Sequence, residues 1–89
     1  MRVLKFGAIW CISCIIMKPI WAEIEAEMPE LKTDYFDIDE NPAMAKQWEV
    51  NDEIPVFIFL DKEGREFARK KGQISKQELL EFIKKNLEK

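Results

Sequence analysis

Two cysteines, Cys11 and Cys14, are separated by two residues in the segment Trp10-Cys11-Ile12-Ser13-Cys14. A cysteine thiolate attacks disulfide bonds and also binds metal ions, so the pair suits either chemistry. The segment falls where a predicted strand ends and a helix begins. Because a helix N-terminus favours negative charge, we expect Cys11 to be the attacking thiolate. Cys14, about one helical turn later, should be more buried and able to attack the mixed disulfide that Cys11 forms.

Other interpretations of the cysteine pair stay open. A zinc site usually takes four ligands, and the chain has two cysteines and no histidine, so a site within one chain would need carboxylates. A zinc or iron–sulfur site shared between two chains and a pair of inert core cysteines are further alternatives. A C-x-x-C between a strand and a helix argues against the inert pair. The lack of histidine also excludes Cys–His and Ser–His nucleophilic pairs.

Length and composition limit the remaining possibilities. With 89 residues, 47% of them hydrophobic and 35% charged, the chain is predicted to form one globular domain over residues 1–89. The net charge of −3 and a single basic cluster, Arg69 to Lys71, do not favour nucleic-acid binding. No signal peptide or membrane-spanning run is visible, so we expect a cytoplasmic protein that does not contact a membrane.

The pattern of apolar and turn-forming residues predicts the elements that position the cysteines. Strands are expected at 2–6, 33–38, 56–60 and 65–71, and helices at 11–28, 41–48 and 75–87. The first two strands, joined by a helix, should be parallel, and the last two, joined by a tight turn, antiparallel. The order β-α-β-α-β-β-α therefore predicts an α/β fold with a mixed four-stranded sheet flanked by helices.

Two patterns predict what these elements bury. Isoleucine and methionine recur at every fourth position of the first helix, which predicts a buried face made of Ile12, Ile16, Ile20, Ile24 and Met28. Ile15 and Met17 are expected to widen this face. Pro19 lies inside this helix and should bend it, because proline removes a backbone hydrogen bond. The continuous apolar run from Val56 to Leu60 predicts a strand buried on both faces.

Several of these features, in this order, resemble the thioredoxin family. WCISC is followed by Pro19 eight residues after Cys11, and Asp37 to Pro42 is similar to the family's NID-x-NP segment. Ile54-Pro55 precedes the buried strand, and Gly72 precedes the last helix. The resemblance extends from Val3 to Leu87. It implies a thioredoxin fold and a thiol–disulfide oxidoreductase that reduces disulfides in partner proteins.

The resemblance also implies roles for individual residues. Cys11 would be the attacking thiol and Cys14 the resolving thiol, with Pro55 in a cis peptide bond facing them. The residues that would line the groove for a partner's extended chain are Trp10, Ile54, Pro55 and Gly72. No cofactor or metal is implied, a separate reductase would supply electrons, and we expect a monomer. A protein disulfide oxidase or isomerase and a dimeric metal-binding or iron–sulfur protein of this fold are the alternatives.

Two residues depart from the family pattern. Lys5 lies six residues before Cys11, where thioredoxins carry a buried aspartate that helps to deprotonate the resolving thiol. A buried lysine there would modulate the pKa of the cysteines or act as a base when neutral, whereas a lysine pointing to solvent would have neither effect. Gly7 replaces the family's tryptophan four residues before Cys11, which predicts a looser loop before the site.

Overall fold

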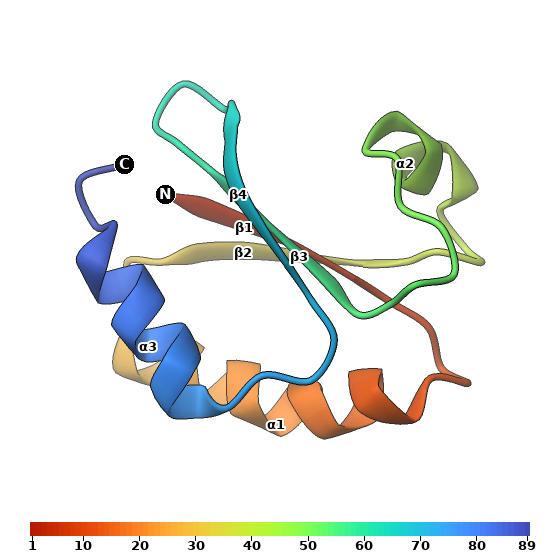
Figure 1. Ribbon diagram of the computed structural model, residues 1–89, viewed down its shortest axis with the longest axis horizontal. Helices are drawn as coiled ribbons and strands as arrows, with labels where there is room; N and C mark the ends of the chain where they lie inside the picture. The colour runs from red at the N-terminus through yellow and green to blue at the C-terminus, as the bar shows by residue number, and fades with distance from the viewer.

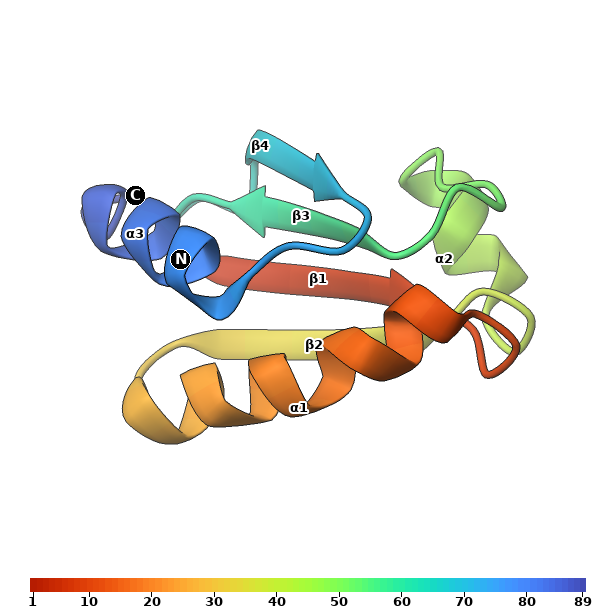
Figure 2. The ribbon, with the colours of Figure 1, turned by 60° about the horizontal axis from the view of Figure 1, so that its bottom comes forward.

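The structure, a computed structural model, describes residues 1–89 and contains one mixed four-stranded sheet with three helices (Figure 1). The elements in chain order are β1 (Arg2–Gly7), α1 (Ile12–Glu27), β2 (Lys32–Asp37), α2 (Pro42–Gln47), β3 (Val56–Leu60), β4 (Glu66–Lys71) and α3 (Lys76–Lys85). The sheet has the order β2-β1-β3-β4, in which β1 is parallel to β2 and antiparallel to β3, and β3 is antiparallel to β4 (Figure 2). The predicted α/β fold and element order are confirmed.

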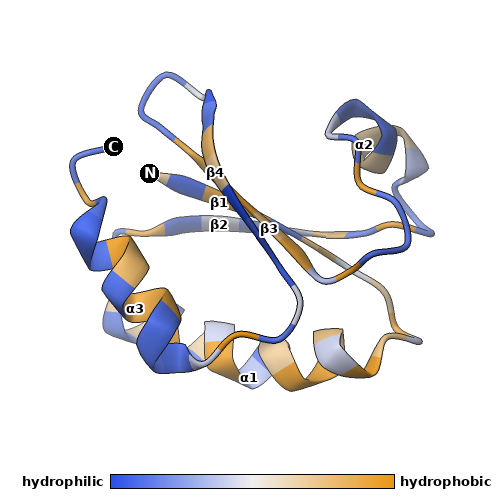
Figure 3. Cartoon of the chain, in the orientation of Figure 1, coloured by the Kyte–Doolittle hydropathy of each residue, from blue (hydrophilic) through white to orange (hydrophobic).

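The helices cover opposite faces of the sheet, and the strands bury apolar residues on both. Helices α1 and α3 pack on one face around Val3, Phe57 and Phe59. Helix α2 packs on the other face, where Phe6 and Ile58 belong to a second buried cluster. All five residues of β3 are buried, as its continuous apolar run predicts, and Figure 3 shows this strand as largely hydrophobic.

The buried face of α1 differs from the prediction. The residues that α1 buries are Cys14, Met17, Trp21 and Ile24, whereas Ile12 is 75% exposed and Ile15 and Ile16 are exposed as well. A row of every fourth residue turns by about 40° around a helix at each step, so five such residues, four steps apart from first to last, cannot stay on one face. The alternating three- and four-residue spacing from Cys14 to Ile24 does stay on one face. The helix continues through Pro19 over 16 residues.

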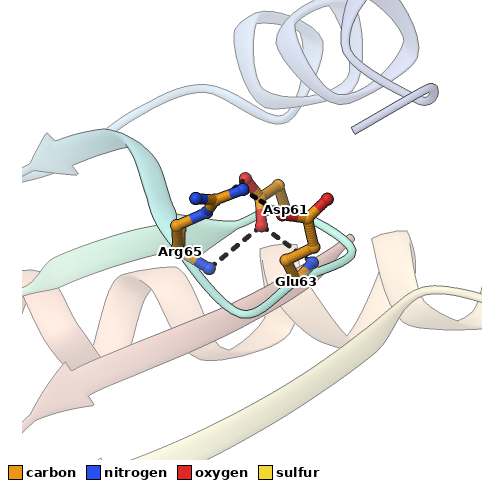
Figure 4. Close-up of polar contacts among 3 residues, drawn as sticks. All are labelled: Asp61, Glu63 and Arg65. Atoms are coloured by element: carbon orange, nitrogen blue, oxygen red, sulfur yellow. Dashed lines mark hydrogen bonds and ion pairs between the residues drawn. The ribbon is translucent and has the colours of Figure 1, made fainter.

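Local hydrogen bonds and backbone conformations define the start of α3 and the turn of the β3–β4 hairpin. Ser75 caps α3, because its Oγ accepts a hydrogen bond from the Glu78 backbone N–H at 3.1 Å. In the hairpin turn, Asp61 Oδ1 accepts hydrogen bonds from the backbone N–H groups of Glu63 and Arg65 (Figure 4). Gly64 has φ +81°, which favours glycine at this position.

None of the three helices combines the length and the apolar character that crossing a membrane requires.

Candidate active site

The cysteine pair lies at the end of the sheet where β1 leads into α1. Cys11 is the N-cap of α1, and its Sγ accepts a hydrogen bond from the backbone N–H of Cys14 at 3.2 Å. A donor aimed at the sulfur and the positive end of the helix both stabilise a negative charge on Cys11. Both cysteines are free thiols, so the structure describes the dithiol form.

The two thiols differ in their surroundings less than we expect from the sequence. Cys11 is 8% exposed and Cys14 is 5% exposed, so Cys14 is the more buried, but Cys11 is not openly exposed either. Burial, and next the hydrogen bond with the Cys11 side chain, raise the pKa of Cys14 to about 12. At neutral pH Cys14 is therefore a protonated thiol, which must lose its proton before it can act as a nucleophile.

The segment before β3 forms the wall opposite the cysteines. The Cys11 thiol donates to the carbonyl oxygen of Ile54 at 3.7 Å, and the Ile54–Pro55 peptide bond is cis. The backbone N–H of Gly72 donates to the Pro55 carbonyl oxygen at 2.8 Å, which ties the end of β4 to this wall. Three of the predicted groove residues, Ile54, Pro55 and Gly72, are thus joined to Cys11 by a chain of contacts.

Trp10, the fourth predicted groove residue, lies on the solvent side of the cysteines. Its side chain is 57% exposed, and its Nε1 donates to Asp39 Oδ2 at 2.8 Å, which fixes the position of the indole. Three isoleucines, Ile9, Ile12 and Ile15, are also more than half exposed around the start of α1. Large apolar side chains exposed together are uncommon on a free surface and indicate a place where a partner binds.

Lys5 does not point to solvent. It projects from β1 beneath α1, its side chain is 14% exposed, and its Nζ donates to Glu25 Oε2 at 2.6 Å. The ammonium also lies 5.6 Å from the ring centroid of Trp21. Thr33 Oγ1 donates to the same carboxylate oxygen at 2.9 Å. The Lys5 side chain is thus engaged as a hydrogen-bond donor to Glu25.

Behind Cys14 lies a cavity of about 280 Å³ between α1 and the strands. Lys5, Cys14, Glu25 and Tyr35 are among its lining residues. Gly7 is the last residue of β1, and a Cβ atom added to it would meet the Tyr35 hydroxyl at 3.0 Å and Cys14 Sγ at 3.1 Å. The prediction of a looser loop at Gly7 is therefore wrong, because the space that a side chain would take is occupied by neighbouring groups.

Sequence reasoning missed Glu25 and Tyr35, although signals for both are present. Glu25 follows Cys14 by eleven residues, which is three helical turns and places both on one face of α1. Tyr35 is paired with Lys5 in the parallel register of β1 and β2, and residues that pair in this way point to the same side of a sheet.

A metal site within the chain lacks ligands, because no three histidine, cysteine, aspartate or glutamate residues are grouped closely enough to hold an ion. A thiol pair at a helix start, facing an Ile–cis-Pro segment at one end of a mixed sheet, is the arrangement of a dithiol protein.

Comparisons with known proteins agree. The thioredoxin family model matches residues 1–85. The thioredoxin of Chlamydia trachomatis is 34% identical over 84 residues, which cover 94% of this chain and 80% of the relative. Thioredoxin H-type 1 of Nicotiana tabacum is 36% identical over 84 residues, again 94% of this chain but 64% of the longer relative. The chain belongs to the thioredoxin family, and it is a thiol–disulfide oxidoreductase.

Solved structures agree on the fold as well. The crystal structure of thioredoxin NaTrxh from Nicotiana alata superposes with a TM-score of 0.85 at 32% identity, covering 94% of this chain and 70% of that one. Mitochondrial thioredoxin 3 from Saccharomyces cerevisiae, in its oxidized form, superposes with a TM-score of 0.82 at 30% identity, covering 94% and 76%.

Proposed function

We propose that this protein reduces disulfide bonds in partner proteins, cycling between the Cys11–Cys14 dithiol and a Cys11–Cys14 disulfide. The observation that carries the proposal is the asymmetry of the pair. The sulfur of Cys11 accepts a backbone N–H at the helix start, whereas the pKa of Cys14 is raised to about 12. Cys11 is therefore the thiol suited to attack the substrate, and Cys14 stays protonated until it is needed.

In the proposed cycle, the Cys11 thiolate attacks one sulfur of the substrate disulfide and forms a mixed disulfide. Cys14, which sits one turn further along α1, then attacks the Cys11 sulfur and releases the reduced substrate. A separate reductase returns the protein to the dithiol form. Lys5 lines the same cavity as Cys14, and its ammonium is paired with Glu25.

The substrate chain is proposed to lie extended across Trp10, Ile54, Pro55 and Gly72. Trp10 is exposed and Ile54 is half-buried beside the Cys11 thiol, whereas the Pro55 side chain is buried, and the exposed Ile9 and Ile12 extend this surface. An apolar segment flanking the substrate disulfide would bury these side chains, and each fully buried isoleucine stabilises the complex by roughly 1.5–3 kcal/mol before ordering costs.

An insulin-reduction assay with dithiothreitol as electron donor tests the proposal. Cys11→Ser should lower turnover by about 1000-fold or more, because no other thiol in the chain can start the reaction. Cys14→Ser, the matched control with the same atom exchange, should instead accumulate a covalent complex with substrate that mass spectrometry detects.

Full turnover by Cys11→Ser would overturn the mechanism. The reduction potential, measured against glutathione, separates reductase from oxidase: a value near about −270 mV fits the proposed reductase, and a value near about −120 mV would replace it with an oxidase.

A further inference from the structure

Tyr35 has a polar group in the cavity behind Cys14 that the proposed cycle leaves unused. It lies on the edge strand β2, and its side chain is 43% exposed, so it connects the cavity to solvent. A Cβ atom added to Gly7 would lie 3.0 Å from the Tyr35 hydroxyl oxygen and 3.1 Å from Cys14 Sγ. Because Gly7 has no side chain, the hydroxyl and the sulfur can approach each other across the position of that atom.

Other charged and titratable groups surround this space. Cys11 lies at the start of α1, and Lys18 and Glu25 lie along this helix. Lys5 comes from β1, and Asp37 and Glu40 lie at the end of β2. β3 and the segment before it contribute Phe57 and Pro55, which do not titrate. Two of them are already engaged, since Glu25 accepts from Lys5, and Asp37 Oδ1 accepts the backbone N–H groups of the next turn. The Tyr35 hydroxyl takes part in none of these hydrogen bonds.

We propose that Tyr35 acts in the resolving step, by donating a hydrogen bond from its hydroxyl to the Cys14 thiolate as that thiolate forms. The inference deepens the proposed function and rests on it. In this step Cys14 gives its proton to water in the cavity and attacks Cys11 Sγ. The Cys11–Cys14 bond forms while the bond between Cys11 and the substrate sulfur breaks. The electron pair leaves on the substrate sulfur, which takes a proton from solvent, so the substrate is reduced and the cysteine pair oxidised.

The electrostatics of Tyr35 fit a donor. Burial, followed by the negative charges of Asp37 and the two cysteines, raises the pKa of Tyr35 above its ordinary value. At neutral pH the hydroxyl is therefore protonated and able to donate a hydrogen bond. A hydrogen bond to a charged acceptor is stronger than one between neutral groups, so the hydroxyl stabilises the thiolate more than the thiol.

The test uses Tyr35→Phe, which removes only the hydroxyl and keeps the aromatic ring. The centroid of this ring lies 5.4 Å from Lys18 Nζ. Reduced protein is mixed with 5,5′-dithiobis(2-nitrobenzoate) in a stopped-flow instrument. The first phase of released thionitrobenzoate reports attack by Cys11, and the second reports resolution by Cys14. We expect the first phase to be unchanged and the second to be about 10-fold slower at pH 7. The pH profile of the second phase should move up by about one unit.

Thr33→Val is the matched control, because it removes a hydroxyl from the same strand that bonds to Glu25 instead of facing Cys14. It should leave both phases unchanged. A second phase in Tyr35→Phe equal to that of the wild type from pH 6 to 10 would overturn the inference, and so would equal slowing of both phases. Failure of the proposed function is distinguishable, because the wild type would then fail to reduce insulin, whatever the two phases of Tyr35→Phe show.

Discussion

Strand β1 sends different kinds of side chain to the two faces of the sheet. Toward α2 it presents Leu4 and Phe6, which belong to a cluster made of apolar residues alone. Toward α1 it presents Val3, then Lys5, and ends at Gly7, so that the apolar core gives way to an ion pair and a cavity as the strand approaches the cysteines. The α2 face contributes to the stability of the fold. The α1 face does so as well, and it also places charged groups near the cysteines.

Three further experiments test this difference between the two faces of the sheet, in addition to the cysteine and Tyr35 variants above.

The largest effect is expected on the α2 face. Ile58→Ala removes a fully buried side chain and should lower the free energy of unfolding by about 3–4 kcal/mol, because a cavity replaces packed atoms. Urea unfolding measures the loss, and the rate of the first thionitrobenzoate phase should not change. Ile15→Ala, at an exposed isoleucine of α1, is the control and should stay within about 0.5 kcal/mol. A large change in the cysteine kinetics of Ile58→Ala would remove the contrast between the faces.

A smaller effect is expected from the ion pair on the α1 face. Glu25→Gln leaves the half-buried Lys5 ammonium without its partner and should lower the free energy of unfolding by about 1 kcal/mol. Glu23→Gln, which breaks an exposed pair with Lys76, should cost less than about 0.5 kcal/mol. Thermal unfolding of both variants measures the difference. Equal losses would mean that burial adds nothing to the Lys5 pair.

The third effect is absent at neutral pH and develops only in alkaline solution. The Cys14 thiol ionises near its ordinary pKa of 9.0 when the chain is unfolded but near 12 when it is folded. Its contribution to stability is therefore complete below pH 9 and is lost as the pH rises toward 12. The unfolding free energy of the reduced protein should fall more steeply from pH 9 to 11 than that of reduced Cys14→Ser. Parallel slopes in the two proteins would contradict the assigned pKa.

Patterns that act over a few residues predicted most of the fold. The strand-to-helix position of Cys11 and the apolar run of β3 each depend on neighbours in the chain, and each was confirmed. The buried face of α1 was predicted only in part. Met17, Ile24 and Met28 are buried as expected, but Ile12 and Ile15 are exposed, because apolar type alone does not decide which side of a helix faces the sheet.

The sequence by itself determined the order of the elements and the closeness of Cys11 and Cys14, since both follow from local spacing and helix geometry. Only the tertiary structure decided what surrounds Cys14. Lys5, Glu25 and Tyr35 come from three different elements, and their approach depends on the register of β1 with β2 and on the rotation of α1 over the sheet. Gly7 shows the same point: its lack of a side chain matters because Tyr35 and Cys14, distant in sequence, both lie against it.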